Sequence, residues 1–225
     1  MGRTVLGARL VARGTFIVVG QDWPMTSPVR GLIVCVPTAS LDDYVGAVEV
    51  LIQEGFTRFA LPAGAEAFRD VVMIFGRRAT FGALRVGTAE QAAGAVEAGA
   101  TFVLADVADD EVAAATGDVP CYLAAMTPTE VRAVYAAPSA AGALIYPADV
   151  VGHALAARLT ELGLVDRAIP MGGIGAYAAG EWLKAGAQAV CIDSTLLGDA
   201  FAGGSLTSLR DRCGSFIAVE KRQEA

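Results

Sequence analysis

The sequence predicts an α/β protein folded as a single (β/α)8 barrel, or TIM barrel, and three observations lead to that prediction. From Gly31 onward, short apolar or β-branched runs alternate with stretches of helical periodicity. There are eight of each, and parallel strands joined by right-handed crossovers close into a barrel at that number. The length of 225 residues also suits one barrel domain. A doubly wound open sheet is the rival fold, but near-equal βα units favour closure.

The alternation defines the expected elements one by one. Predicted strands are Leu32–Val36, Arg58–Leu61, Thr80–Leu84, Phe102–Ala105, Cys121–Ala124, Gly142–Tyr146, Ala168–Met171 and Ala189–Ile192. Predicted helices are Asp42–Glu54, Glu66–Phe75, Ala89–Ala98, Asp110–Thr116, Pro128–Tyr135, Val151–Leu162, Ala176–Ala185 and a final helix from Leu206 to Glu220.

Local signals at the helix ends agree with this order. Gly55, Gly99 and Gly186 each follow a helix, where a glycine adopts a left-handed conformation at least cost. Thr127–Glu130 has the pattern of a helix start, with a capping threonine, proline at the first position and an acid in the first turn.

The first 28 residues are expected to form an N-terminal extension to a barrel that spans residues 29–225. Thr15–Val19 has the pattern of a short strand, and Gln21–Pro28 is a polar break that contains prolines. The extension is compatible with a hairpin that plugs the barrel, with an oligomer contact or with disorder. Its arginines are spread out rather than clustered before an apolar run, which does not match a signal peptide.

Composition excludes several classes of partner. The net charge is −7, whereas a nucleic-acid-binding protein is expected to present a basic face. No apolar run reaches the roughly 18–20 residues that span a bilayer. The four cysteines (Cys35, Cys121, Cys191 and Cys213) lack metal-type spacing, and they fit reduced core residues of a cytoplasmic protein. No cofactor and no metal site are predicted.

Four segments resemble the 2-keto-3-deoxy-6-phosphogluconate (KDPG) / 4-hydroxy-2-oxoglutarate (KHG) aldolase family in order and spacing. They are Ala125–Glu130, Tyr146–Gly152, Pro170–Ile174 and Glu181–Gly186. The second is similar to the family's strand-six exit, and the third to its phosphate-binding turn. The resemblance covers roughly residues 31–222 and implies a class I aldolase-like barrel, carbon–carbon lyase chemistry in carbohydrate metabolism and a homotrimer.

That chemistry needs a lysine on strand six, which forms an imine with a 2-oxo acid. The resemblance places Leu144 at the lysine position, and the only two lysines of the chain, Lys184 and Lys221, lie on predicted helices. The family's acid–base glutamate falls at Leu61 and its substrate arginine near Val36. The chain is therefore expected to be a divergent member without Schiff-base chemistry.

The phosphate site that the resemblance implies is only half kept. Gly172 and Gly173 preserve a turn whose backbone N–H groups can approach an anion. The partner turn contains Asp193 and Ser194, and the Asp193 carboxylate would repel a phosphate. Alternatively, Asp193 caps a helix that begins at Ser194.

Other polar residues are expected at the carboxyl ends of the strands, where sites in this fold gather. Arg85, Asp106 and Asp193 can bind a carboxylate or polyol ligand, or they can form an inert salt-bridge network. Candidate catalytic residues are Asp106, Tyr146 and Asp193. Candidate ligand-binding residues are Arg85, Gly172, Gly173, Asp193 and Ser194. His153 fits an ordinary surface residue better than a base.

Three functions follow from these residues. The first is a diverged or catalytically silent homologue, a pseudoenzyme, that binds a small 2-oxo acid or sugar acid. The second is a lyase or isomerase that uses Asp/Tyr acid–base or metal chemistry, for which paired aspartates offer hard oxygen ligands. The third, a true KDPG/KHG aldolase, conflicts with the two misplaced lysines.

Overall fold

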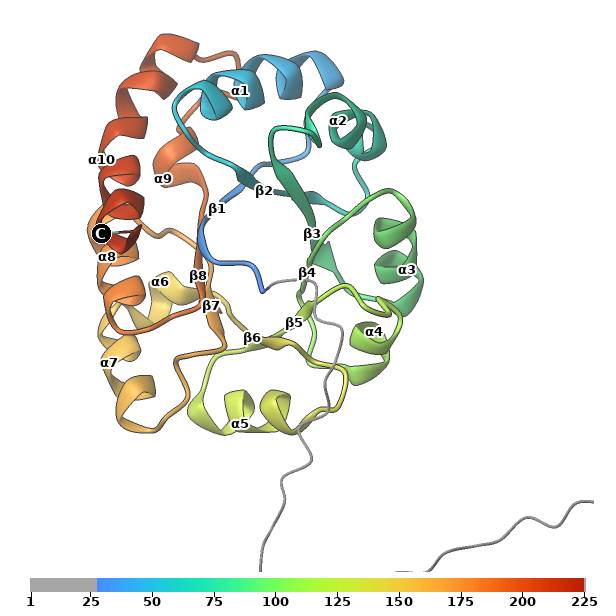
Figure 1. Ribbon diagram of the computed structural model, residues 1–225, viewed down its shortest axis with the longest axis vertical. Helices are drawn as coiled ribbons and strands as arrows, with labels where there is room; N and C mark the ends of the chain where they lie inside the picture. The colour runs from blue at the N-terminus through green and yellow to red at the C-terminus, as the bar shows by residue number, and fades with distance from the viewer. Residues whose placement is uncertain (1–27, 225) are drawn as a thin grey trace, which may run out of the picture.

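The computed structural model describes residues 28–224 and shows eight parallel strands ringed by helices (Figure 1). The hydrogen-bonded order is β7-β6-β5-β4-β3-β2-β1-β8, with every pair parallel. The strands are β1 Gly31–Cys35, β2 Arg58–Pro62, β3 Thr80–Val86, β4 Val103–Ala105, β5 Cys121–Ala125, β6 Gly142–Ile145, β7 Ala168–Pro170 and β8 Ala189–Ile192. The predicted barrel is confirmed, and the calls on residues 1–27 lie outside the described residues.

The helices surround the barrel in the expected alternation (Figure 1). They are α1 Leu41–Gln53, α2 Phe68–Phe75, α3 Ala89–Glu97, α4 Asp110–Ala114, α5 Pro128–Ala136, α6 Ala148–Val151, α7 Ala154–Glu161, α8 Ala176–Lys184, α9 Ser194–Leu197 and α10 Leu206–Glu224. None of the helices in residues 28–224 is long and apolar enough to cross a membrane.

Helix ends follow the sequence signals, with one correction. Thr127 and Glu130 form a reciprocal capping box at the start of α5, as predicted. Gly55, Gly99 and Gly186 have φ values of 109°, 103° and 103° directly after helices. The helix predicted over Val151–Leu162 begins later, with α7 at Ala154, because Gly152 takes a φ of 69° and ends the separate short helix α6 at Val151.

The core has two parts, which follow from the alternation of side chains along each strand. An outer cluster joins the strands to the helices and includes residues such as Leu61 and Trp182. An inner cluster fills the barrel and contains no helix residue. Its members are Ile33, Cys35, Ala60, Leu84, Phe102, Leu104, Tyr122, Leu144, Ile169, Met171, Ala189 and Cys191.

This division corrects the expected position of Leu61. Because Ala60 belongs to the inner cluster, its neighbour Leu61 points outward, where it packs in the outer cluster. Pro62 is the residue of β2 that faces the open end of the barrel. Leu144, by contrast, is fully buried in the inner cluster, as expected for a side chain that points into the barrel.

The barrel is nearly closed, with its seam between β7 and β8, the two ends of the hydrogen-bonded order. At the start of the strands, the Gln188 N–H donates across the seam to the Ala168 carbonyl at 3.1 Å. Beyond the strand ends, the Thr195 hydroxyl donates to the Ile174 carbonyl at 2.6 Å. The seam is therefore held by separate hydrogen bonds rather than by a ladder.

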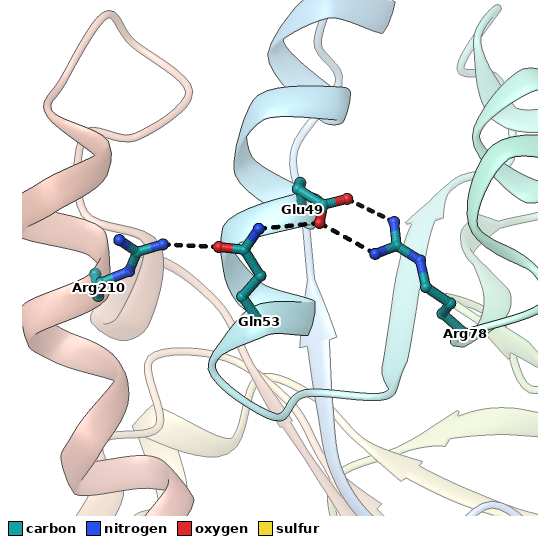
Figure 2. Close-up of polar contacts among 4 residues, drawn as sticks. All are labelled: Glu49, Gln53, Arg78 and Arg210. Carbon is teal, nitrogen blue, oxygen red and sulfur yellow. Dashed lines mark hydrogen bonds and ion pairs between the residues drawn. The ribbon is translucent and has the colours of Figure 1, made fainter.

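Polar contacts tie the outer helices together on the side of α1. Gln53 and Glu49 lie on α1, with Arg210 of α10 on one side and Arg78 on the other (Figure 2). Arg78 donates two hydrogen bonds to the Glu49 carboxylate. The last turns of α10 are fixed to β2 by the ion pair of Arg58 with Glu220 at 2.6 Å.

The barrel interior is packed so tightly at Gly82 that adding one methyl group there should destabilise the protein. A Cβ atom on Gly82 would lie 2.2 Å from the Phe102 ring, so Gly82→Ala should lower the free energy of unfolding by about 1–3 kcal/mol. Gly94→Ala is the matched control, because nothing lies within 4 Å of its Cβ position on α3. It should stabilise the protein by about 0.5–1 kcal/mol. Urea unfolding tests both, and equal effects would contradict the packing described.

The pair of Glu49 with Arg78 predicts a pH dependence. Hydrogen bonds from Arg78, and then from Gln53, lower the pKa of Glu49 to about 2. A carboxyl with a lowered pKa stabilises the fold above its ordinary value of 4.5, and this stabilisation is lost as the pH falls towards 2. Arg78→Ala should return the pKa of Glu49 towards 4.5 in an NMR titration, whereas Arg77→Ala should leave it low. An unchanged pKa in Arg78→Ala would contradict the assignment.

Candidate functional site

A cavity of about 730 Å³ opens at the carboxyl ends of β1, β2, β3 and β8. We call it the mouth cavity. It is lined by Cys35, Val36, Pro37, Thr38, Pro62, Leu84, Arg85, Met171, Asp193, Ser194, Leu197, Gly198, Phe201 and Ala202. Its size lies within the range of small-molecule sites, and its position is the one at which (β/α)8 barrels carry their functional residues.

Arg85 enters this cavity from a distorted end of β3. The register between β3 and β4 shifts between Ala83 and Val86, and Arg85 has a φ of 61°. A left-handed arginine costs on the order of 1–3 kcal/mol, so surrounding contacts must hold it in place. Backbone strain of this kind is concentrated at functional sites.

Two side chains orient the Arg85 guanidinium. Its Nη1 lies 3.3 Å from the Asp106 carboxylate, and its central carbon, Cζ, lies 4.8 Å from the centre of the Tyr146 ring. Burial opposes the charge, but hydrogen bonding to Tyr146 and attraction by Asp106 outweigh it and raise the pKa of Arg85. Arg85 therefore carries a fixed positive charge, and half of its side chain remains exposed.

Asp193 binds the backbone turn that the sequence assigns to an anion. The Gly173 N–H donates to Asp193 Oδ2 at 3.3 Å. A short helix does begin at Ser194, but the Asp193 side chain makes no capping hydrogen bond to it, so the expected cap is wrong. Asp193 follows β8 and so bonds across the β7–β8 seam, where its carboxylate accepts the N–H of Gly173.

A second carboxylate lies against the same turn. The Asp149 side chain approaches Gly173 so closely that a Cβ there would lie 3.1 Å from its Oδ2. Gly172 and Gly173 have φ values of 108° and 60°. Only glycine takes this pair of conformations at little cost, which explains the Gly-Gly sequence.

The predicted site residues fall into two groups. Arg85, Asp106 and Tyr146 form one contact group, and Gly172, Gly173, Asp193 and Ser194 form another across the mouth. The expected network that joins Arg85 to Asp193 is replaced by separate partners for each. His153 is exposed at the start of α7 and contacts the Tyr177 ring edge-on, which fits the surface role predicted for it.

Both lysines lie outside the barrel. Lys184 is on α8, with its side chain 77% exposed and 4.0 Å from Glu181, and Lys221 is exposed on α10. In residues 28–224, no three His, Cys, Asp or Glu side chains are grouped so as to hold a metal ion.

Sequence reasoning missed Cys35, Thr38, Pro62 and Met171 as residues of the cavity wall. Strict alternation along β1 and β2 would have identified Cys35 and Pro62 as inward-facing. Thr38 lies in a loop, and no sequence signal marks the direction in which it faces.

The fold of this chain is similar to those of several solved barrel structures. A 4-hydroxy-2-oxoglutarate/2-dehydro-3-deoxyphosphogluconate aldolase from TTHB1 superposes with a TM-score of 0.71 at 25% identity, over 84% of this chain and 93% of that one. KDPG aldolase from Legionella pneumophila, with pyruvate captured as a covalent carbinolamine, gives 0.71 at 20% identity over 85% and 94%. The chain has the fold of the KDPG/KHG aldolases.

The likeness extends to a barrel of another activity. Thiamine phosphate pyrophosphorylase from Pyrococcus furiosus gives a TM-score of 0.64 at 15% identity, over 87% of this chain and 97% of that one. No protein-family model matches the sequence, and neither does any curated protein. At these identities the comparisons establish an aldolase-like fold, and function must be argued from the mouth of this barrel.

Occupation of the Gly173 N–H by Asp193 predicts the effect of Asp193→Ser on anion binding. Removing the charge should raise affinity for inorganic phosphate at least about tenfold, because like charges a few ångströms apart cost kilocalories per mole. Isothermal titration calorimetry measures the change. Asp166→Ser removes the same charge at the other end of the barrel and should have no effect. Equal phosphate affinity in both variants would show that Asp193 does not block the turn.

Proposed function

We propose that the protein binds a small carboxylic acid, of the 2-oxo acid or sugar acid class, at Arg85 in the mouth cavity and without a Schiff base. The observation that carries this proposal is the placement of Arg85. It is a cation held in a strained backbone conformation at the edge of a cavity of about 730 Å³.

Arg85 keeps hydrogen-bonding capacity for a ligand. A guanidinium has five N–H donors, and the ion pair with Asp106 uses Nη1. The Tyr146 ring centre lies 4.8 Å from the guanidinium carbon, and half of the Arg85 side chain remains exposed to the solvent. A planar edge with paired donors suits bidentate binding of a carboxylate.

The rest of the mouth favours small ligands without phosphate. Asp193 and Asp149 place two carboxylates at the Gly172–Gly173 turn, where a phosphate dianion would be repelled. Apolar residues such as Leu84 and Met171 form part of the wall, and the hydroxyls of Thr38 and Ser194 offer hydrogen bonds to ligand oxygens.

The positions of the lysines support binding without an imine. Leu144 is fully buried in the barrel, and Lys184 and Lys221 are on outer helices. An imine requires an amine beside the ligand, and the exposed Lys184, 4.0 Å from Glu181, lies outside the mouth. Catalytic roles for Asp106, Tyr146 and Asp193, the lyase or isomerase alternative, a homotrimer and a cytoplasmic location stay predictions.

Binding of pyruvate, 2-oxoglutarate and gluconate tests the proposal by calorimetry. For any acid that binds, Arg85→Ala should weaken affinity by about tenfold or more, the equivalent of one charge-assisted hydrogen bond. Arg85→Lys keeps the charge but loses the paired donors, so its affinity should be intermediate. Arg77→Ala removes a charge on the outside of the barrel and is the control. Binding that survives Arg85→Ala unchanged would overturn the proposal.

A further inference from the structure

Three sulfur side chains gather beneath the mouth cavity, apart from the polar groups assigned above. Cys35 is at the end of β1, Cys191 is in β8, and Met171 directly follows β7. All three belong to the inner cluster. Strands β7, β8 and β1 are successive around the barrel, so the three sulfurs come from one sector of its wall.

Cys35 and Cys191 occupy neighbouring inward-facing positions on the paired strands β1 and β8. In the parallel register, Ile33 is opposite Cys191, which puts Cys35 one inward-facing position closer to the mouth. The other cysteines are separate from this pair: Cys121 packs in the outer cluster, and Cys213 donates to the Leu209 carbonyl within α10.

The sulfurs are enclosed yet reachable. Cys191 is fully buried, whereas Cys35 and Met171 retain 7% and 3% exposure and both line the mouth cavity. Their inner-cluster neighbours, such as Ile33, Leu144 and Ile169, are apolar and exclude water. A small ion that enters the mouth cavity therefore meets Cys35 and Met171 in its wall.

We propose that Cys35, Cys191 and Met171 form a binding site for a soft monovalent metal ion, Cu(I). Thiolate and thioether ligands select Cu(I), whereas Mg²⁺ and Ca²⁺ prefer oxygen. Each thiol loses its proton when its sulfur binds the metal, so one Cu(I) and two thiols give a dithiolate complex and two released protons. The flexible Met171 side chain supplies a third, adaptable sulfur.

The competing explanation is that these residues only fill space, because buried cysteine and methionine also behave as small apolar side chains. The two explanations differ in which sulfur residues copper binding depends on. A site depends on Cys35, Cys191 and Met171 together, whereas incidental binding of copper by thiols would involve Cys121 and Cys213 equally.

Competition for Cu(I) with a chromophoric chelator, in the reduced full-length protein without oxygen, tests the site. The protein should take one Cu(I) per chain from the chelator. Cys35→Ala and Cys191→Ala should abolish this uptake, and Met171→Leu, which keeps the volume of the side chain, should weaken it about tenfold. The double variant Cys121→Ala/Cys213→Ala removes two thiols outside the site, one more than either single variant, and should bind as the wild type does.

Circular dichroism of each copper-free variant separates loss of the site from loss of the fold. Should Cys191→Ala fail to fold, Cys35→Ala and Met171→Leu carry the test, because both positions border the cavity. Uptake that is absent in the wild type, or equal in Cys35→Ala and the Cys121/Cys213 double variant, would overturn the proposal. Arg85→Ala should leave copper uptake unchanged. The copper test is therefore independent of the proposal that Arg85 binds a carboxylate.

Discussion

The seam between β7 and β8 is the constraint on which the mouth of this barrel depends. The ladder that joins the other strands ends on either side of it, so closure rests on single hydrogen bonds. Gly173 with Asp193 and Ile174 with Thr195 provide two of them at the mouth. A carboxylate beside an open glycine turn is costly in an anion site, but here it joins two strand exits. Under the proposed function, the same residue that helps to close the barrel also disfavours phosphate.

Most polar side chains at the mouth are paired with other groups of the protein. Asp193 is bound to Gly173, and Asp106 is paired with Arg85. In the described chain, no buried side-chain nitrogen or oxygen lacks a hydrogen-bond partner. Arg85 can still form hydrogen bonds with a ligand, because its side chain is half-exposed while Asp106 and Tyr146 hold it. A preorganised cation of this kind needs little reorganisation to accept a carboxylate.

Sequence alone predicted the barrel, the inward position of Leu144 and the nearness of Arg85 to Asp106, because periodicity and strand order determine these features. It grouped Asp193 with these two residues, but Asp193 bonds to Gly173 instead. It failed where a shift of one residue decides the outcome. Leu61 is adjacent to an inward-facing residue and therefore points outward. Whether Asp193 caps its own helix or bonds to Gly173 depends on contacts across the seam, between residues 20 positions apart. The proximity of Cys35 to Cys191 likewise follows from closure of the barrel, which brings the first strand beside the last.

The central claim is that an aldolase-like barrel binds its ligand through Arg85 and not through an imine. Incubation with pyruvate and borohydride, followed by intact-mass and peptide mass spectrometry, tests it most directly, because reduction makes any imine permanent. The account predicts an unmodified chain under conditions in which a Schiff-base aldolase is labelled completely. A reduced pyruvyl adduct on Lys184 or Lys221, formed in proportion to protein that remains folded, would contradict it.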